Sequence, residues 1–168
     1  MSNSQSSQEA EAPVQTAGKK TRQFSTFFLH GLYLGVEVLK VQELIRFQHM
    51  TRVPLASNVV RGLINLRGQI VTAIDLRRQF GMPDRESDRD PMNVVVRTDE
   101  GAVSLLVDEI GDVVEVDEQQ FERAPDTVRG RARDLVSGVY KLDGRLLLVL
   151  DVQQAVNTDR SVAGAAAA

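Results

Sequence analysis

Asn65 and Arg67 are the polar side chains of an otherwise aliphatic stretch that ends at Gly68. Residues two apart in a strand face the same side, so we expect the amide and the guanidinium to lie together. A guanidinium offers five donors in one plane, and an amide both donates and accepts, which suits carboxylates and backbone carbonyls of another protein. Asn65 is equally consistent with an ordinary solvent-facing strand position. The pair is therefore a candidate protein-binding site.

Apolar neighbours have to support such a site, because an exposed ion pair contributes only about 0.2–1 kcal/mol. Val41, Leu44 and Ile45 have the i, i+3, i+4 spacing of one helical face, and we predict a short helix over residues 39–46. A stripe of this kind is more often simply core, so both interpretations stay open. Glu43 points away from the stripe and is either part of the binding surface or an ordinary solvated carboxylate.

Residues that could support catalysis or metal binding are few. Cysteine is absent, which excludes thiolate metal sites and thiol nucleophiles and leaves His30 and His49 as nitrogen ligands. Both are expected to be exposed loop residues. Asp75 and Asp151 precede short predicted helices, which favours helix caps over paired catalytic carboxylates, and the sequence has no Walker pattern for nucleotide phosphates. We expect no enzyme activity, no metal and no cofactor.

The charge balance argues against nucleic acid as the main partner, since 20 Lys and Arg against 23 Asp and Glu give a net charge of −3. In residues 128–133 three arginines alternate with other residues, either as a binding patch or as a solvated loop. The longest aliphatic run, residues 146–150, is far shorter than the roughly 20 residues of a membrane span. The polar N-terminus lacks the apolar core of a signal peptide. We expect a cytoplasmic protein without direct membrane contact.

The chain contains an internal duplication. Residues 62–80 (GLINLRGQIVTAIDLRRQF) align without a gap with residues 138–156 (GVYKLDGRLLLVLDVQQAV). A weaker match relates residues 38–45 to residues 107–114. Two copies of one unit are the simplest explanation.

The duplication suggests how the chain is organised. We predict one barrel at about residues 23–81 and a second at about residues 92–157. The polar, proline-bounded residues 82–91 are expected to form the linker between them. Residues 1–22 are expected to be a disordered tail, and residues 158–168 a flexible one.

Local patterns within each copy favour strands. Residues 32–38 alternate between two faces, and Asp143-Gly144 between two apolar runs is a strong hairpin signal. Helices are expected to be few and short, over residues 76–80 and in a turn after Asp117. We therefore predict a mainly β protein of two small barrels packed side by side.

The hairpin turn of the first copy differs from that of the second, because Arg67-Gly68 stands where the second copy has Asp143-Gly144. A type I′ turn has positive φ at its first loop position, which Asn, Asp and Gly adopt more readily than Arg. If both turns share one geometry, Arg67 carries a local cost, and residues that break a local rule are candidates for function. A longer or bulged loop would remove this cost.

Several motifs closely resemble those of CheW, the bacterial chemotaxis coupling family. They are VLKVQELI at residues 38–45, GLINLRG at residues 62–68 and IDLR at residues 74–77. The later segments LVDEI and LVLDV extend the likeness, so that a CheW-like domain is expected over residues 23–157. The resemblance implies two Src-homology-like five-stranded β-barrels and no catalytic activity.

The resemblance also implies two protein partners. Members of the family bind the regulatory domain of the histidine kinase CheA and the helical hairpin tip of methyl-accepting chemoreceptors, in membrane-associated or cytoplasmic arrays. By matching motif, the expected receptor-binding residues are Val41, Glu43, Leu44, Asn65, Arg67 and Met92. The expected kinase-binding residues are Gly62 and Ile110.

Overall fold

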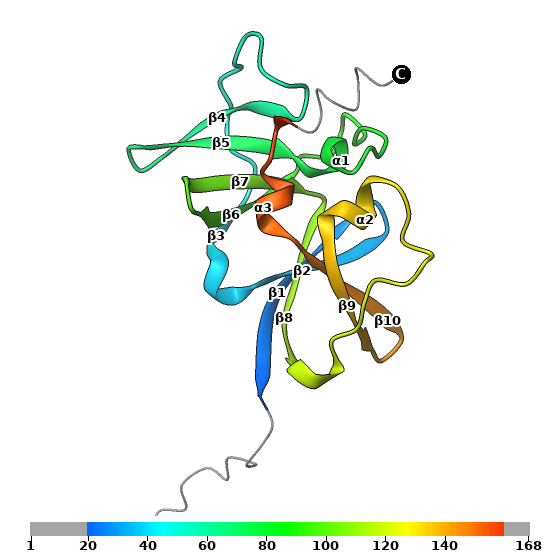
Figure 1. The fold of residues 1–168 in the computed structure, drawn as a ribbon. Coiled ribbons are helices and arrows are strands. Elements are labelled where there is room, and N and C mark those ends of the chain that lie inside the picture. The colour runs from blue at the N-terminus through cyan, green and yellow to red at the C-terminus, as the bar shows by residue number, and fades with distance from the viewer. Residues whose placement is uncertain (1–19, 160–168) are drawn as a thin grey trace, which may run out of the picture.

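Ten β-strands, three short α-helices and two 3₁₀ turns make up residues 20–159, the part of the chain that the computed structural model describes (Figure 1). The first half contains β1 (Thr21–Leu29), β2 (Leu32–Glu37), η1 (Val38–Lys40), β3 (Val41–Ile45), β4 (Val60–Leu66), β5 (Gln69–Asp75) and α1 (Leu76–Gln79). The second half contains β6 (Met92–Thr98), β7 (Gly101–Val107), β8 (Glu109–Asp117), η2 (Glu118–Gln120), α2 (Arg131–Leu135), β9 (Val136–Leu142), β10 (Arg145–Leu150) and α3 (Val152–Ala155). The predicted mainly β fold with few short helices is confirmed.

The strands form two five-stranded sheets that repeat one pattern. Sheet 1 has the order β8-β1-β2-β10-β9, and sheet 2 has the order β3-β6-β7-β5-β4. If each strand from β1 to β5 is exchanged with the strand five places later, β1 with β6 and so on to β5 with β10, the order of sheet 1 becomes the order of sheet 2. The structure therefore contains the internal duplication seen in the sequence.

Each sheet takes its strands from both copies, so the predicted barrels at residues 23–81 and 92–157 are wrong. Sheet 1 combines the first two strands of the first copy with the last three of the second, and sheet 2 does the reverse. The chain changes sheets at η1 and again at Asp108. A repeat shows which strands are equivalent, but it does not show which copy supplies their partners.

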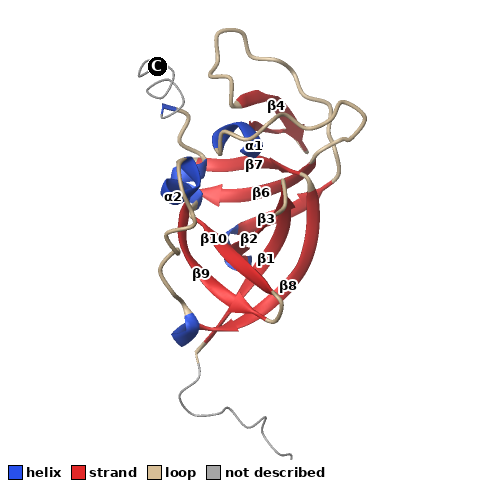
Figure 2. Ribbon diagram, turned by 90° about the vertical axis from the view of Figure 1, so that its right-hand side faces the viewer, coloured by secondary structure: helices blue, strands red, loops and turns tan. Residues whose placement is uncertain are grey.

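The curled sheets are not closed barrels. Figure 2 shows how strongly the strands curve, but within residues 20–159 no strand pairing joins β8 to β9 or β3 to β4. Those four strands remain sheet edges. The linker region, residues 82–91, contains neither helix nor strand.

The ends of the chain need one correction. Thr21 and Arg22 belong to β1, so the predicted disordered tail of residues 1–22 includes two residues that are in fact part of a strand. The rest of that tail, residues 1–19, and residues 160–168 of the predicted C-terminal tail lie outside the described residues.

The largest hydrophobic core lies between the two sheets. Phe27 and Leu34 of sheet 1 and Val96 and Leu105 of sheet 2 are buried in it, each with at most 1 % of its surface exposed. A smaller cluster around Tyr140 lies within the curl of sheet 1. Another lies within the curl of sheet 2, around Ile64. Because burying one such side chain contributes about 1.5–3 kcal/mol, the shared core fixes how the sheets sit on each other.

The helix predicted over residues 39–46 is wrong, since η1 is followed directly by strand β3. A bulge between Val41 and Glu43 explains the error. It resets the alternation, so that Val41 pairs with Val96 and Leu44 with Val94 on the same side of the sheet. A bulged strand thus produced the three-residue spacing that is typical of a helix.

Aspartates cap α1, α3 and η2, as predicted, whereas α2 and η1 begin without a side-chain cap. The Asp75 carboxylate accepts from the backbone N–H of Arg78 (3.4 Å), and the equivalent Asp151 accepts from that of Gln154 (3.2 Å). Asp117 caps η2 by accepting from the backbone N–H of Gln119 (3.0 Å). These carboxylates hold local structure, which accounts for their equivalent places in the two copies.

Two glycines allow a loop to cover a sheet edge at equivalent places in the two copies. Thr51 exchanges backbone hydrogen bonds with Leu63 of β4 (2.9 and 2.8 Å), and Glu122 does so with Val139 of β9 (2.9 and 2.9 Å). A Cβ on Gly62 would lie 2.6 Å from the Thr51 carbonyl oxygen. A Cβ on Gly138 would lie 2.7 Å from that of Glu122. Glycine is therefore required at both positions by close backbone packing.

We expect Gly62→Ala to lower the free energy of unfolding by about 2–3 kcal/mol, because the Thr51 backbone has to move to admit the methyl group. Urea unfolding followed by circular dichroism measures the loss. Gly144→Ala is the control, since its Cβ would enter open space and meets only the cost of a positive φ (75°), about 1 kcal/mol. Equal losses in the two variants would show that the close contact is unimportant.

Candidate partner-binding surface

The β4–β5 turn presents Arg67 in a strained backbone conformation. Arg67 has φ 51° and Gly68 has φ 87°, while Leu66 and Gln69 pair across the hairpin. The Asn65 side-chain oxygen accepts a hydrogen bond from the Gly68 backbone N–H (2.9 Å) and so holds the turn. Arg67 thus has the positive φ that a shared turn geometry would have required of it, at a cost of about 1–2 kcal/mol.

The equivalent turn of the second copy is relaxed. Gly144 has φ 75°, but Asp143 is not among the non-glycine residues with positive φ, which within residues 20–159 are His30, Leu55 and Arg67. The two hairpins therefore do not share one geometry. Asp143, which adopts the left-handed conformation more readily than arginine does, is not left-handed, whereas Arg67 at the equivalent position is.

The Arg67 side chain extends into solvent and meets Glu43. The guanidinium is 86 % exposed, and its Nη2 lies 3.1 Å from Oε2 of Glu43, whose side chain is 20 % exposed. Glu43 is on β3 and Arg67 follows β4, so the ion pair joins the two edge strands of sheet 2. Glu43 is therefore a partner of Arg67 and not an isolated solvated carboxylate.

Apolar side chains accompany the pair. On β3, Leu44 is 40 % exposed and Val41 packs against the margin of the core between the sheets. Ile70, which is 61 % exposed, lies across the hairpin from the exposed Asn65. The structure thus brings Glu43, Asn65 and Arg67 together, with apolar surface on the adjoining strands.

Met92 does not belong to this group. It begins β6 beyond the Ile45–Asn93 pair, is half-buried and packs against the core between the sheets.

Sequence reasoning did not single out Leu39, which is 85 % exposed in η1 at the change of sheets. Arg97 holds this turn in place by donating to the carbonyl oxygens of Leu39 and Val41 (3.3 Å each). A groove of about 450 Å³ opens beside it between the sheets, lined by charged residues that include Lys40 and Arg97. A leucine so exposed adds to the apolar surface near β3.

The two expected kinase-binding residues lie in different settings. Gly62 is buried beneath Thr51, so a partner would meet the covering loop and not Gly62 itself. Ile110 is half-buried on β8 of sheet 1, at the place that Val41 occupies in the first copy. In the same comparison Asp112 replaces Glu43 and Asp143 replaces Arg67.

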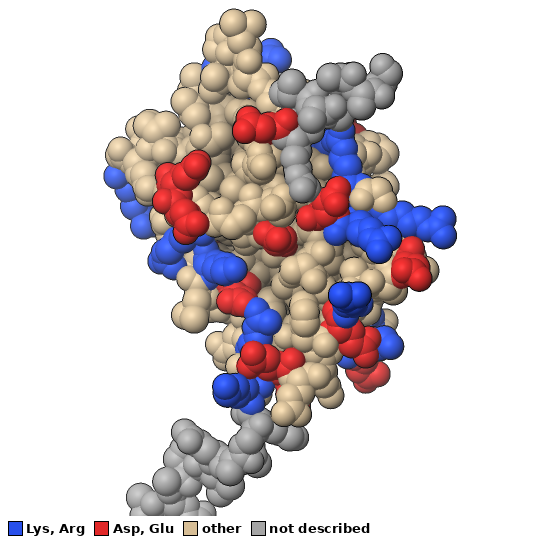
Figure 3. Space-filling model, in the orientation of Figure 1, with Lys and Arg blue, Asp and Glu red and all other residues tan. Residues whose placement is uncertain are grey.

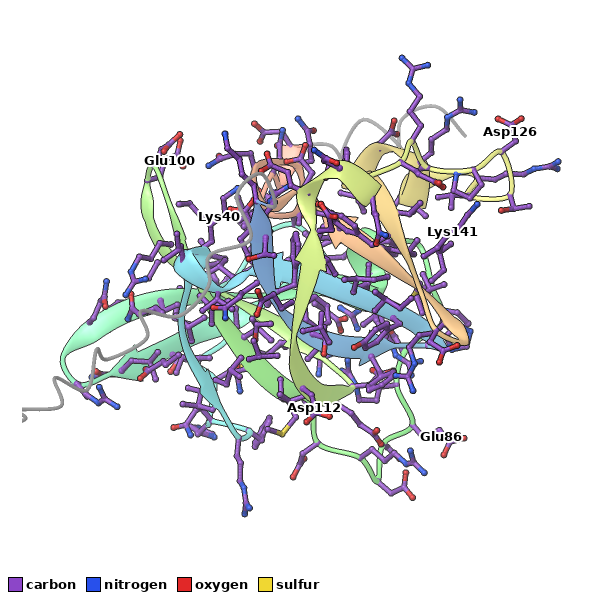
Figure 4. All side chains as sticks on the ribbon, turned by 90° about the horizontal axis from the view of Figure 1, so that it is seen from below. Lys40, Glu86, Glu100, Asp112, Asp126 and Lys141 are labelled. Carbon is purple, nitrogen blue, oxygen red and sulfur yellow. The ribbon has the colours of Figure 1, made fainter. Side chains whose placement is uncertain are left out.

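The second copy therefore carries a surface of different charge. Glu109, Asp112 and Glu115 are exposed along β8 with Val113, which is 58 % exposed. Figure 4 shows Asp112 directed away from the body of the molecule. Where the first copy has an ion pair, the second has carboxylates only.

Asp108 is the centre of an ion-pair cluster that sequence reasoning missed. It accepts from Arg77 at both carboxylate oxygens (2.8 and 2.6 Å), from Nε of Arg85 (3.0 Å) and from the His30 backbone N–H (2.8 Å). Burial opposes ionisation of Asp108, but the hydrogen bonds from Arg77, His30 and Arg85 outweigh it and lower its pKa to about 2. His30 lies in the turn between β1 and β2 of sheet 1, and Arg77 follows β5 of sheet 2, so the cluster ties the two sheets together.

Between residues 20 and 159, no three His, Cys, Asp or Glu side chains are grouped so that they could hold a metal ion. In the same region no helix is both long enough and apolar enough to cross a bilayer.

Comparison with known proteins decides the family. The family model described as the CheW-like domain matches residues 23–160, which is most of the chain. The chain belongs to the CheW-like domain family. The resemblance inferred from the motifs is therefore confirmed.

Relatives named chemotaxis protein CheW match over most of their length. The protein from Klebsiella aerogenes is 28 % identical over 138 residues, covering 82 % of this chain and 83 % of the relative. The protein from Bacillus subtilis is 29 % identical over 135 residues, covering 80 % and 86 %. Membership of the CheW family places the chain among chemotaxis coupling and scaffold proteins and not among enzymes.

A solved CheW structure shares the fold. The scaffolding protein TtCheW from Thermoanaerobacter tengcongensis superposes with a TM-score of 0.73 at 24 % identity, covering 82 % of this chain and 89 % of that one. The two-sheet arrangement described above is therefore the CheW-like fold.

Proposed function

We propose that this CheW-family protein couples methyl-accepting chemoreceptors to the histidine kinase CheA, and that it does so by binding alone. The observation that carries the proposal is Arg67, a fully charged side chain held outward on a strained turn and paired with Glu43. Strained backbone positions cluster at functional sites, so the positive φ of Arg67 supports a binding role for this turn. We place the protein in the cytoplasm, recruited to receptor arrays.

The receptor is assigned to the surface of the first copy. An ion pair with apolar neighbours suits a helical hairpin tip, because the guanidinium and the carboxylate can each bond polar side chains while Leu44 and Leu39 contact apolar ones. Val41 and Asn65 complete the receptor-binding set, and the half-buried Met92 is left out of it.

The kinase regulatory domain is assigned to other parts of the molecule. Ile110 lies on β8 of sheet 1 in a carboxylate-rich setting, on the other sheet from the β4–β5 turn, whereas Gly62 is buried and offers no contact surface of its own. Surfaces of different charge select different partners, because like charges brought together disfavour the wrong one.

Reconstitution tests the coupling function. Receptor membranes, the kinase and this protein are combined, and kinase autophosphorylation is measured with and without this protein. We expect receptor control of the kinase only when the protein is present, with no turnover of substrate by the protein alone. Unchanged kinase activity in its presence would reject the proposal.

We expect kinase binding to survive Arg67→Glu, since the kinase is assigned to surfaces away from the β4–β5 turn. Titration of the kinase regulatory domain by isothermal calorimetry should give dissociation constants within about twofold for the variant and the wild type. Loss of kinase binding together with receptor binding, in a variant that is still folded, would instead mean that the partners share one surface.

A further inference from the structure

The loop between β3 and β4 is basic in a protein that is acidic overall. Residues 46–61 contain Arg46, His49, Arg52 and Arg61 and no aspartate or glutamate, although the whole chain has a net charge of −3. Arg61, the last residue of this segment, pairs with Asp75, and the neighbouring Arg78 pairs with Asp75 and Asp84. Within residues 20–159, Arg46 and Arg52 form no ion pair.

The same loop exposes large apolar side chains. Phe47 is 40 % exposed, Val53 is 38 % exposed and Leu55 is fully exposed. Leu55 also has φ 63°, a conformation that costs a leucine about 1–2 kcal/mol.

The loop is nevertheless held in one shape. Thr51 is fixed to Leu63 by two backbone hydrogen bonds, the Val60 N–H donates to the Ser57 carbonyl (3.0 Å), and Nη1 of Arg78 donates to the Asn58 carbonyl (2.8 Å). A surface ordered in advance loses less entropy on binding than a free loop does. These contacts leave the apolar and basic side chains of the tip pointing outward.

A groove of about 310 Å³ lies at the base of the loop. Phe47, Met50 and Val60 supply apolar lining, and Arg52 and Arg61 supply charge. A concave site with apolar walls and convergent arginines suits side chains of both kinds from one ligand.

We propose that this basic loop, residues 46–61, is a further docking surface that binds an acidic segment of a partner protein bearing apolar side chains. Arginine pairs with carboxylates in a planar, bidentate manner, and the unpaired Arg46 and Arg52 are available for this. Apolar contacts with Phe47 and Leu55 supply the larger share of affinity, since exposed ion pairs contribute little. An anionic membrane matches the charge, but a flat surface does not fill a groove.

The surface is separate from the receptor-binding surface. In Figure 1 the β4–β5 turn projects to the left, whereas the loop that precedes β4 rises at the top of the molecule. In Figure 3, which has the same orientation, the top of the molecule is largely tan, the colour of residues other than Lys, Arg, Asp and Glu, with basic side chains in blue at its margin. The inference does not depend on the proposed coupling function.

A peptide titration tests the proposal. The probe is a fluorescein-labelled 15-residue peptide in which leucines at i, i+3 and i+4 spacing alternate with glutamates, added to the full-length protein while anisotropy is measured. We expect saturable micromolar binding that weakens with added salt, and at least tenfold weaker binding by Arg52→Glu and by Leu55→Asp. Arg129→Glu is the matched control, because it reverses an exposed arginine that lies outside both the loop and the receptor-binding surface, and it should bind as the wild type does.

Four outcomes would overturn the proposal. The first two are that the leucine–glutamate peptide does not bind saturably, or that Arg52→Glu binds it as tightly as the wild type does. The third is that a glutamate–glycine peptide of the same charge binds as tightly as the leucine–glutamate peptide. The fourth is that the protein binds phosphatidylglycerol vesicles but not the peptide. Leu55 is fully exposed, so Leu55→Asp is expected to keep the wild-type unfolding midpoint, and thermal unfolding verifies that the variant is folded.

Discussion

Reversing the charge at Arg67 is expected to abolish receptor binding while the fold stays intact. Arg67→Glu places a carboxylate against Glu43 and removes the donors that the turn directs into solvent. Truncating a hot-spot residue of an interface costs about 2 kcal/mol or more, or roughly 30-fold in affinity, and charge reversal at such a residue should exceed that. Calorimetric titration with a soluble receptor fragment that contains the hairpin tip measures the loss.

Stability provides the internal check on that result. Because the Arg67–Glu43 pair is exposed, its loss should lower the free energy of unfolding by no more than about 1 kcal/mol. Arg129→Glu serves as the control, since it reverses another exposed arginine that makes only a 3.4 Å hydrogen bond to a nearby carbonyl. Wild-type receptor affinity in Arg67→Glu, or equal losses in both variants, would contradict the assignment of the receptor surface.

The sequence was sufficient to predict those parts of the structure that depend on neighbouring residues. The hairpin at Asp143-Gly144 and the capping aspartates Asp75 and Asp151 each follow from a few consecutive side chains. The internal duplication could also be predicted, because residues 62–80 align with residues 138–156 without a gap. Each of these predictions agrees with the structure.

The errors arose where distant strands had to be paired. The repeat could not show that each sheet exchanges strands between the copies, because equivalent strands from either copy have the same pattern. The predicted helix over residues 39–46 failed because a bulge after Val41 spaces apolar residues as a helix would. Chemical periodicity identifies a buried face, but it does not distinguish a bulged strand from a short helix.

The candidate surface divides in the same way. Arg67 was identified because comparison of the two copies exposed a poor turn former, which is a local signal. The ion pair with Glu43 and the cluster around Asp108 join residues from separate parts of the chain, and the sequence contains no local sign of them. The motif IDLR contains Arg77 and the motif LVDEI contains Asp108, but neither motif indicates that these two side chains are in contact.

Removing the charge of Asp108 is expected to lower the free energy of unfolding by about 2–3 kcal/mol at pH 7. A carboxylate whose pKa falls from 3.8 to about 2 on folding contributes about 2 kcal/mol when solvent screening is allowed for. Asp108→Asn keeps the shape but leaves Arg77 and Arg85, which are 14 % and 10 % exposed, without their anion. Urea unfolding of the variant and the wild type measures the difference.

The pH dependence of that difference tests its origin. Because the pKa of Asp108 is lower in the folded state, its contribution is complete above the unfolded value of 3.8 and is lost as the pH falls toward 2. The gap between wild type and Asp108→Asn should therefore be constant from pH 7 to about 5 and shrink steadily below 4. Asp84→Asn is the matched control, since Asp84 also pairs with an arginine (3.0 Å to Arg78) but is 62 % exposed, and it should cost no more than about 1 kcal/mol. If Asp108→Asn costs no more than Asp84→Asn, or if the gap does not depend on pH, the cluster does not hold the sheets together as we infer.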